Sequence, residues 1–306
     1  GYGIDDNLLD WIKDFLSNRF QYVKVGCSVS DVSDVTSGVP QGSVLGPTLF
    51  IYYINDMPDV LDCLIKIFAD DTKIYSTVNN VSDALALQSN VDKLLDWSQQ
   101  WQLTFNSKKC KVLHAGRKNC KHDYYMNGNK LEETTAEKDL GVIVDPDLSF
   151  NTHINETIKK ANRLCGMLVG NIQCKDANIM VPLFKSLVRP VIEYGNPIWN
   201  TLLKKHTTPI EDIQRRFTKK IIGLNKLSYE ERLAITRLPS LEYRRLRGDM
   251  IETFKIVHGF YDKVTVCSLF QFNTFSNTRG HPFKLHKPTI STSKFANFFT
   301  NRVINV

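Results

Sequence analysis

The spacing of apolar residues predicts two amphipathic helices in the first third of the chain. In residues 5–19 the apolar positions recur every three or four residues after two acidic residues, which is the pattern of a helix with one apolar face. These positions are Leu8, Leu9, Ile12, Phe15 and Leu16. A second helix is expected after Ser82, whose side chain can cap the first turn. Its inner stripe consists of Ala84, Leu87, Val91, Leu94, Ser98 and Trp101.

Short runs with strand-like patterning predict antiparallel hairpins around these helices. Residues 64–69 and 72–78 flank Asp70-Asp71 as the two arms of one hairpin. In residues 124–131 the dipeptide Asn127-Gly128 is a strong signal for a tight two-residue turn. Three further short strands are expected at residues 22–25, 110–115 and 140–144.

Residues 31–47 are rich in glycine and proline, so we expect no regular structure there before Thr48. The apolar run from Thr48 to Asn55 is expected to be helical or buried. Because Gly46, Pro47 and Thr48 interrupt the longest apolar run, it is too short to span a bilayer, and we expect no membrane partner.

From residue 150 onward the pattern becomes helical and basic. Five helices are expected, at residues 153–172, 176–194, 207–224, 228–236 and 240–259. Beyond Tyr261 the periodicity fades, which predicts an irregular tail over residues 261–306. The expected fold class is therefore α+β in the first half, followed by an α-helical domain.

Charge is distributed unevenly between these halves. The net charge of +7 combines about −7 in residues 1–150 with about +14 in residues 151–306. This asymmetry suggests that the basic half binds a polyanion and the acidic half binds cations. Many helical surfaces are rich in lysine and arginine without binding any ligand, so charge alone leaves both interpretations open.

The seven cysteines are scattered, odd in number and include no CxxC pair. This usage is typical of reduced thiols in an intracellular protein. Cys110, His114, Cys120 and His122 crowd one segment, but their spacing matches no usual zinc finger, so a zinc site is disfavoured.

Two segments carry candidate chemistry. Asp70 and Asp71 are adjacent carboxylates at the tip of a hairpin, where they repel each other unless a divalent cation lies between them. Their apolar flanks predict a buried approach to this tip. The second segment, residues 37–47, has three glycines that let a ligand approach the backbone, and Gln41 can contact a base or sugar edge. Taken alone, a solvated Asp-Asp turn and a glycine-rich surface loop are the commoner interpretations.

Four ordered segments together resemble the reverse transcriptases of non-LTR retrotransposons, in particular those of jockey and CR1-like elements. The segments are residues 37–47 with Phe68-Ala69-Asp70-Asp71, residues 103–114, residues 137–144 and residues 188–195. The resemblance implies a polymerase that uses Mg²⁺ or Mn²⁺, an RNA template, a DNA primer and dNTPs. It implies a partial palm at residues 1–147, a helical thumb or connection region at 148–260, and the tail beyond.

The resemblance also assigns roles to individual residues. Asp70 and Asp71 match the catalytic, metal-binding pair. Gln41 and Gly42 match the segment that packs against the nucleotide and template, and Lys109, with Lys108 as its rival, matches the residue that assists pyrophosphate departure. Leu140, Gly141 and Val142 match the strand that grips the primer end. The basic helices match a thumb whose Arg215, Arg216, Lys219 and Lys220 face the nucleic-acid backbone.

The resemblance implies one departure from a working enzyme. The family's first catalytic Asp lies upstream of a segment like residues 2–11, so we expect this chain to lack that residue, the fingers and any endonuclease domain. It is then expected to be inactive alone. The alternative is a non-catalytic nucleic-acid-binding remnant of a decayed element. The full-length element protein is expected to act in the nucleus.

Overall fold

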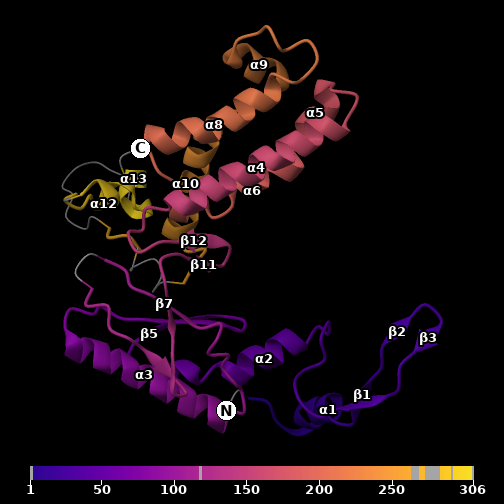
Figure 1. Ribbon diagram of the computed structural model, residues 1–306, viewed down its shortest axis with the longest axis vertical. Coiled ribbons are helices and arrows are strands. Elements are labelled where there is room, and N and C mark those ends of the chain that lie inside the picture. The colour runs from indigo at the N-terminus through magenta and orange to yellow at the C-terminus, as the bar shows by residue number, and fades with distance from the viewer. Residues whose placement is uncertain (1–2, 117–118, 263–268, 273–282, 291, 305–306) are drawn as a thin grey trace. The chain divides into compact units, whose positions relative to one another are not determined.

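The structure is a computed structural model that describes residues 3–116, 119–262, 269–272, 283–290 and 292–304 (Figure 1). The chain divides into two compact units. The first consists of residues 1–110 and 118–132, and the second consists of residues 111–117 and 133–306. Helices and small two-stranded sheets mix in the first half, and helices dominate the second half, so the expected fold class is confirmed at this level.

The first unit begins with helix α1 and four short strands, in which the first pairs with the fourth and the second with the third. Its elements are α1 (Asp6–Leu16), β1 (Arg19–Gln21), β2 (Lys24–Val25), β3 (Ser28–Val29), β4 (Ser33–Val35), α2 (Gly46–Ile54), a 3-10 turn (Met57–Val60), β5 (Leu64–Phe68), β6 (Asp71–Tyr75), α3 (Val81–Gln100), β8 (Tyr125–Met126) and β9 (Asn129–Lys130). The predicted helix over residues 5–19 is confirmed, although Leu8 and Leu9 on its apolar face are exposed.

Two expectations for the segment before residue 48 are wrong. Strand β4 forms within residues 31–47 because it pairs antiparallel with β1, from Arg19 opposite Val35 to Gln21 opposite Ser33. Helix α2 begins at Gly46 rather than Thr48. Pro47 is compatible with this start, since its missing N–H lies in a first turn that needs no intrahelical donor.

Helix α3 forms the core of the first unit. Val91, Leu94 and Ser98 of its predicted stripe are buried, and Trp97 beside them is also buried. The cap of α3 differs from the expectation. Asn80, not Ser82, accepts a hydrogen bond from the backbone N–H of Asp83 at 2.9 Å, because the helix begins one residue before Ser82.

The second unit is a bundle of helices with two small two-stranded sheets. Its elements are β7 (Lys111–Leu113) paired with β10 (Glu132–Thr134), β11 (Glu137–Asp139) paired with β12 (Val142–Val144), α4 (Asn151–Asn171), α5 (Ala177–Leu183), α6 (Arg189–Glu193), α7 (Asn196–Trp199), α8 (Lys204–Thr218), α9 (Tyr229–Thr236), α10 (Leu241–Val257), α12 (Ser293–Asn297) and α13 (Phe299–Ile304). Helices α4 and α8 lie side by side (Figure 1).

The helix expected at residues 176–194 is confirmed over residues 177–193, and its middle turn is π-helical. Pro190 cannot donate a backbone hydrogen bond within the helix, and the preceding residues Phe184–Val188 form a π-helical turn between α5 and α6. This turn is nevertheless central to the core. Phe184 is fully buried and its ring centroid lies 4.9 Å from that of Phe217 on α8.

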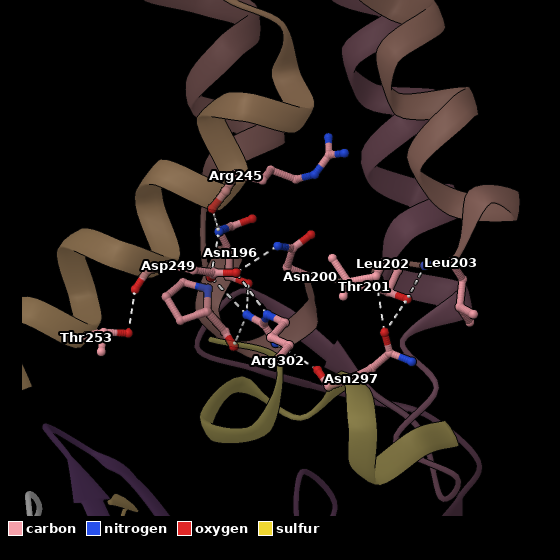
Figure 2. Close-up of polar contacts among 11 residues, drawn as sticks. Asn196, Asn200, Thr201, Leu202, Leu203, Arg245, Asp249, Thr253, Asn297 and Arg302 are labelled. Carbon is pink, nitrogen blue, oxygen red and sulfur yellow. Dashed lines mark hydrogen bonds and ion pairs between the residues drawn. The ribbon is translucent and has the colours of Figure 1, made fainter. Parts of the chain in front are cut away.

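The irregular tail expected at residues 261–306 is wrong for residues 293–304, which form α12 and α13. Arg302 on α13 is 2% exposed, and its Nε and Nη2 atoms each donate to the carboxylate of Asp249 on α10 at 2.9 Å (Figure 2). The side-chain amides of Asn196 and Asn200 also donate to Asp249, at 3.0 and 2.9 Å. Helices of five and six residues are too short for periodicity to reveal, so the sequence pattern missed this buried network.

None of the helices within the described ranges has the length and hydropathy needed to cross a bilayer.

Candidate functional site

The paired carboxylates lie at the tip of the β5–β6 hairpin. The strands are antiparallel with Phe68 opposite Asp71, so Ala69 and Asp70 form a two-residue turn. Ala69 has φ +51°, a left-handed conformation that L residues other than glycine adopt at a cost. Asp70 therefore lies in the turn and Asp71 is the first residue of β6. Both side chains are exposed, so water and a cation can reach them.

One face of this hairpin is anchored and the other is open. Ile65, Ile67 and Ile74 pack against the core that contains Trp97 and Leu94. On the opposite face, Leu64 and Phe68 are more than three-fifths exposed, so the expectation of a fully buried approach is wrong. Alternate residues of a strand point to opposite faces, and only one face of this two-stranded sheet is covered.

The glycine-rich segment forms a tight, specific loop before α2. Arg19 donates from Nη2 to the carbonyl oxygen of Gly38 at 2.6 Å, and Ser43 donates to the carbonyl of Pro40 at 2.7 Å. A Cβ at Gly46 would lie 2.9 Å from that carbonyl oxygen, so the close approach requires glycine. Gln41 and Gly42 are exposed in this loop, and Gly42 has φ +82°.

The candidate lysines follow an asparagine turn. The backbone N–H of Lys108 donates to the side chain of Asn106 at 3.2 Å, and that of Lys109 donates to the carbonyl of Asn106 at 2.9 Å. Both lysine side chains are exposed. Within the described part of the first unit, no hydrogen bond or ion pair joins Gln41, Asp70 and Lys109.

The segment expected to grip the primer is a turn rather than a continuous strand. Strand β12 begins at Val142, whereas Leu140 and Gly141, with φ +44° and +87°, form the turn after β11. Tyr194 donates from its hydroxyl to the carbonyl oxygen of Leu140 at 2.7 Å. A Cβ at Gly141 would lie 2.9 Å from the Tyr194 ring, and one at Gly195 would lie 2.9 Å from the Val142 side chain. Two separate sequence motifs thus meet, and pattern reasoning had not identified Tyr194 as their link.

The four basic residues expected on the thumb all lie exposed at the C-terminal end of α8. Arg215 forms an ion pair with Asp212 at 2.5 Å, and Arg216 donates to the side chain of Asn162 on α4 at 3.1 Å. Lys219 and Lys220 follow the last helical residue, Thr218. Other arginines of this basic half face inward. Arg232, Arg245 and Arg302 are each at most 4% exposed, so the formal charge overstates the positive surface.

Among the residues that the structure describes, no three His, Cys, Asp or Glu side chains gather into a group that could hold a metal ion. In the described part of the chain, Asp70 and Asp71 are joined by no third ligand of these types.

Comparison with known proteins identifies the first half of the chain. Residues 2–144, which contain the glycine-rich loop and the carboxylate hairpin, match the family described as reverse transcriptase (RNA-dependent DNA polymerase). Residues 2–144 therefore contain a reverse transcriptase domain.

Its relatives come from mobile elements. The chain is similar to the RNA-directed DNA polymerase from mobile element jockey of Drosophila melanogaster, with 30% identity over 226 residues, 69% of this chain and 25% of the relative. The jockey polymerase of Drosophila funebris is 30% identical over 239 residues, which are 72% of this chain and 25% of that relative. The probable RNA-directed DNA polymerase from transposon X-element of D. melanogaster is 27% identical over 222 residues, which are 69% of this chain and 24% of that relative. The resemblance to the reverse transcriptases of jockey-like non-LTR retrotransposons is confirmed.

The chain spans about a quarter of the length of these relatives. No solved structure matches it.

Proposed function

We propose that this chain is part of an RNA-directed DNA polymerase of a non-LTR retrotransposon. The observation that carries the proposal is the exposed carboxylate pair at the tip of a core-anchored hairpin, inside the segment that matches the family. Residues 1–147 would then be a partial palm, residues 148–260 a thumb or connection region, and the nucleus the place of action of the full-length protein.

The donor chemistry at the tip fits a hard divalent cation. Mg²⁺ binds through one or two carboxylates and completes its shell with water and substrate phosphate oxygens, and Asp70 and Asp71 supply two exposed carboxylates. Such an ion, when bound, activates the primer 3′-hydroxyl and stabilises the leaving pyrophosphate. Ala69, held in a two-residue turn, fixes the carboxylates relative to the anchored strands.

The other candidate residues have complementary roles in this proposal. Gln41 and Gly42 present an open backbone and an amide to the nucleotide and template. Lys109, with Lys108 as its rival, would neutralise the departing pyrophosphate. Leu140, Gly141 and Val142 would support the primer end, and the Tyr194 hydrogen bond holds their turn in place.

Residues 1–306 alone are proposed to lack polymerase activity. Two metal ions that hold the attacking and the leaving oxygen need more ligands than one carboxylate pair supplies. Within the described residues, no third carboxylate joins Asp70 and Asp71. A primer-extension assay on an RNA template tests this, with and without the upstream segment of a jockey-like polymerase. Robust synthesis that depends on Asp70 in the 306-residue chain would contradict it.

Metal binding is tested separately by titrating Mn²⁺ and following water proton relaxation. Weak binding is expected for the wild-type chain and less for Asp70→Asn, because one of two ligands is lost. Asp34→Asn is the matched control, since Asp34 is an exposed strand aspartate in the same unit. Identical relaxation curves for the wild type and Asp70→Asn would contradict the proposal that Asp70 binds a metal ion.

The basic end of α8 is proposed to contact the phosphate backbone of an RNA–DNA duplex, independent of sequence. The affinity should fall steeply with salt, with a slope of roughly −0.9 per phosphate neutralised. Changing Arg215, Arg216, Lys219 and Lys220 to Glu should weaken binding and make the slope shallower. Lys204→Glu with Lys205→Glu, two exposed lysines at the opposite end of α8, is the control. An unchanged affinity and slope would show that these residues face only solvent.

The alternative function is a non-catalytic nucleic-acid-binding remnant of a decayed element. Duplex binding by the basic end of α8 would persist in that case. Polymerase activity would then stay absent after the upstream segment is supplied, which distinguishes the two candidates.

A further inference from the structure

The single-turn helix α7 follows Tyr194, the residue that contacts the turn at Leu140 and Gly141. A helix of four residues is far too short to be stable by itself, so its position comes from tertiary contacts. The residue before it, Gly195, has φ +65°, and the chain there is held by no regular element. The contacts made by α7 therefore determine where Tyr194 lies.

Arg302 on α13 supplies these contacts from more than 100 residues further along the chain. Its Nη2 atom donates to the carbonyl oxygen of Pro197 at 2.8 Å and to that of Asn196 at 3.3 Å. Helix ends leave carbonyl groups without a partner, so an external donor such as this guanidinium satisfies them. The ion pair with Asp249 on α10 holds the guanidinium in place for these bonds (Figure 2). Arg302 thus joins α7 to both α10 and α13.

Two further contacts relate the position of α7 to the turn. Trp199, which is 1% exposed, donates from its indole Nε1 to the carbonyl oxygen of Tyr194 at 2.7 Å. The hydroxyl of Tyr194 donates to the carbonyl oxygen of Leu140, and its ring lies so close to Gly141 that no Cβ fits there. A continuous series of hydrogen bonds and packing contacts within the second unit therefore leads from Arg302 to the turn.

We propose that Arg302 is a positioning residue for the turn formed by Leu140 and Gly141. The inference rests on the proposed polymerase function, in which this turn supports the primer end, and it adds the residue that determines where the turn lies. Arg302 acts through α7 and Tyr194 rather than on the primer itself. The rival explanation is that Arg302 only stabilises the packing of α13 against α10.

The test variant is Arg302→Lys, because lysine keeps a cation beside Asp249 but has only one nitrogen to replace the bonds to Asp249 and to α7. Arg232→Lys is the matched control. Arg232 is also buried in the second unit and donates to backbone carbonyl groups, those of Leu227 and Arg215, which lie outside α7. If Arg302→Lys does not fold, the double variant Arg302→Gln, Asp249→Asn takes its place, since it removes both buried charges together.

NMR spectra of the whole chain without nucleic acid give the first readout. The α-proton of Gly141 that a Cβ would replace points at the Tyr194 ring, so the ring current shifts its signal. The Nε1 proton of Trp199 reports the hydrogen bond to the Tyr194 carbonyl. Both signals should shift in Arg302→Lys and stay in place in Arg232→Lys. Unchanged signals in Arg302→Lys, or equal shifts in the two variants, would overturn the inference, because an arginine that only stabilises the fold does not position the turn.

A labelled primer separates the inference from the proposed function. A fluorescent base analogue at the primer 3′ end, annealed to RNA, should change its emission on binding the wild-type chain more than the same analogue far from the end. This end-specific change should be largely lost in Arg302→Lys and kept in Arg232→Lys, and its retention in Arg302→Lys would overturn the inference. Equal changes at both primer positions with the wild type would contradict the primer role of the turn, whereas the NMR shifts would still decide whether Arg302 positions it.

Discussion

The hydroxyl of Tyr194 donates a hydrogen bond to the carbonyl oxygen of Leu140, 54 residues earlier in the chain, at 2.7 Å. The ring of Tyr194 also covers Gly141, where no Cβ fits. The turn proposed to support the primer end is thus held by a residue just after helix α6, in addition to the pairing of β11 with β12.

Removing this contact should loosen the turn. Tyr194→Phe is expected to lower the free energy of unfolding by roughly 0.5–1 kcal/mol, the net worth of one hydrogen bond. Gly141→Ala should cost about 1–3 kcal/mol, because it adds a clash with the ring to an unfavourable φ. In a Tyr194→Ala background the cost of Gly141→Ala should be smaller. Urea unfolding of the wild type, Gly141→Ala, Tyr194→Ala and the double variant gives the coupling free energy between the two positions. Strictly additive changes in the free energy of unfolding would show that the ring does not hold the turn.

Arg302 and Asp249 should be strongly coupled. Arg302→Met leaves a carboxylate buried without its cation and is expected to cost about 3–5 kcal/mol. Adding Asp249→Asn should restore part of the loss, since no unpaired charge remains inside. Thermal unfolding of the single and double variants measures this, and a double variant less stable than Arg302→Met would contradict the coupling.

Arg245 presents the opposite case. It is 2% exposed, Figure 2 shows its guanidinium pointing away from Asp249, and neither Nη1 nor Nη2 has a hydrogen-bond partner within the described structure. Desolvation lowers the pKa of this arginine. Arg245→Met is therefore expected to leave the free energy of unfolding unchanged or raise it by about 1 kcal/mol. A decrease in the free energy of unfolding of more than about 2 kcal/mol would mean that nearby carboxylates such as Glu211 compensate the charge of Arg245 in the wild type.

His153 should make stability depend on pH. Burial lowers its pKa below the ordinary value of 6.5, and its Nδ1 accepts a hydrogen bond from the backbone N–H of Ile143 at 3.3 Å. As the pH falls below 6.5 the unfolded chain binds a proton before the folded one, so the free energy of unfolding decreases. His153→Gln, which keeps an acceptor, should reduce this decrease between pH 7.5 and 5, with His206 accounting for a remainder. An identical pH profile in the variant would exclude His153 as a source.

Local chemistry explains which features the sequence predicted. The Asn127-Gly128 hairpin is confirmed, with positive φ at both residues, because the requirement lies in the two turn residues themselves. The hairpin expected around Asp70-Asp71 is also confirmed, but its turn residues are Ala69 and Asp70, because Asp71 pairs with Phe68. The open face at Leu64 and Phe68 was not predicted, since whether an apolar strand residue is covered depends on what packs against the sheet.

Long-range pairing explains what the sequence pattern missed. Asp249 and Arg302 are 53 residues apart, and each alone looks like an ordinary surface charge of a helix. Tyr194 is similarly inconspicuous until its partner Leu140 is known. The roles proposed for Gln41, Lys109 and the basic end of α8 stay predictions, because they concern ligands rather than the fold.

The Asp249–Arg302 pair also has a consequence for protein synthesis. A chain that ends between Asp249 and Arg302 contains the carboxylate of Asp249 without its arginine counter-charge. Such a chain should be recognised as misfolded and degraded. A frameshift or nonsense mutation between the codons for Asp249 and Arg302 would therefore destabilise the helical unit and would not merely shorten it.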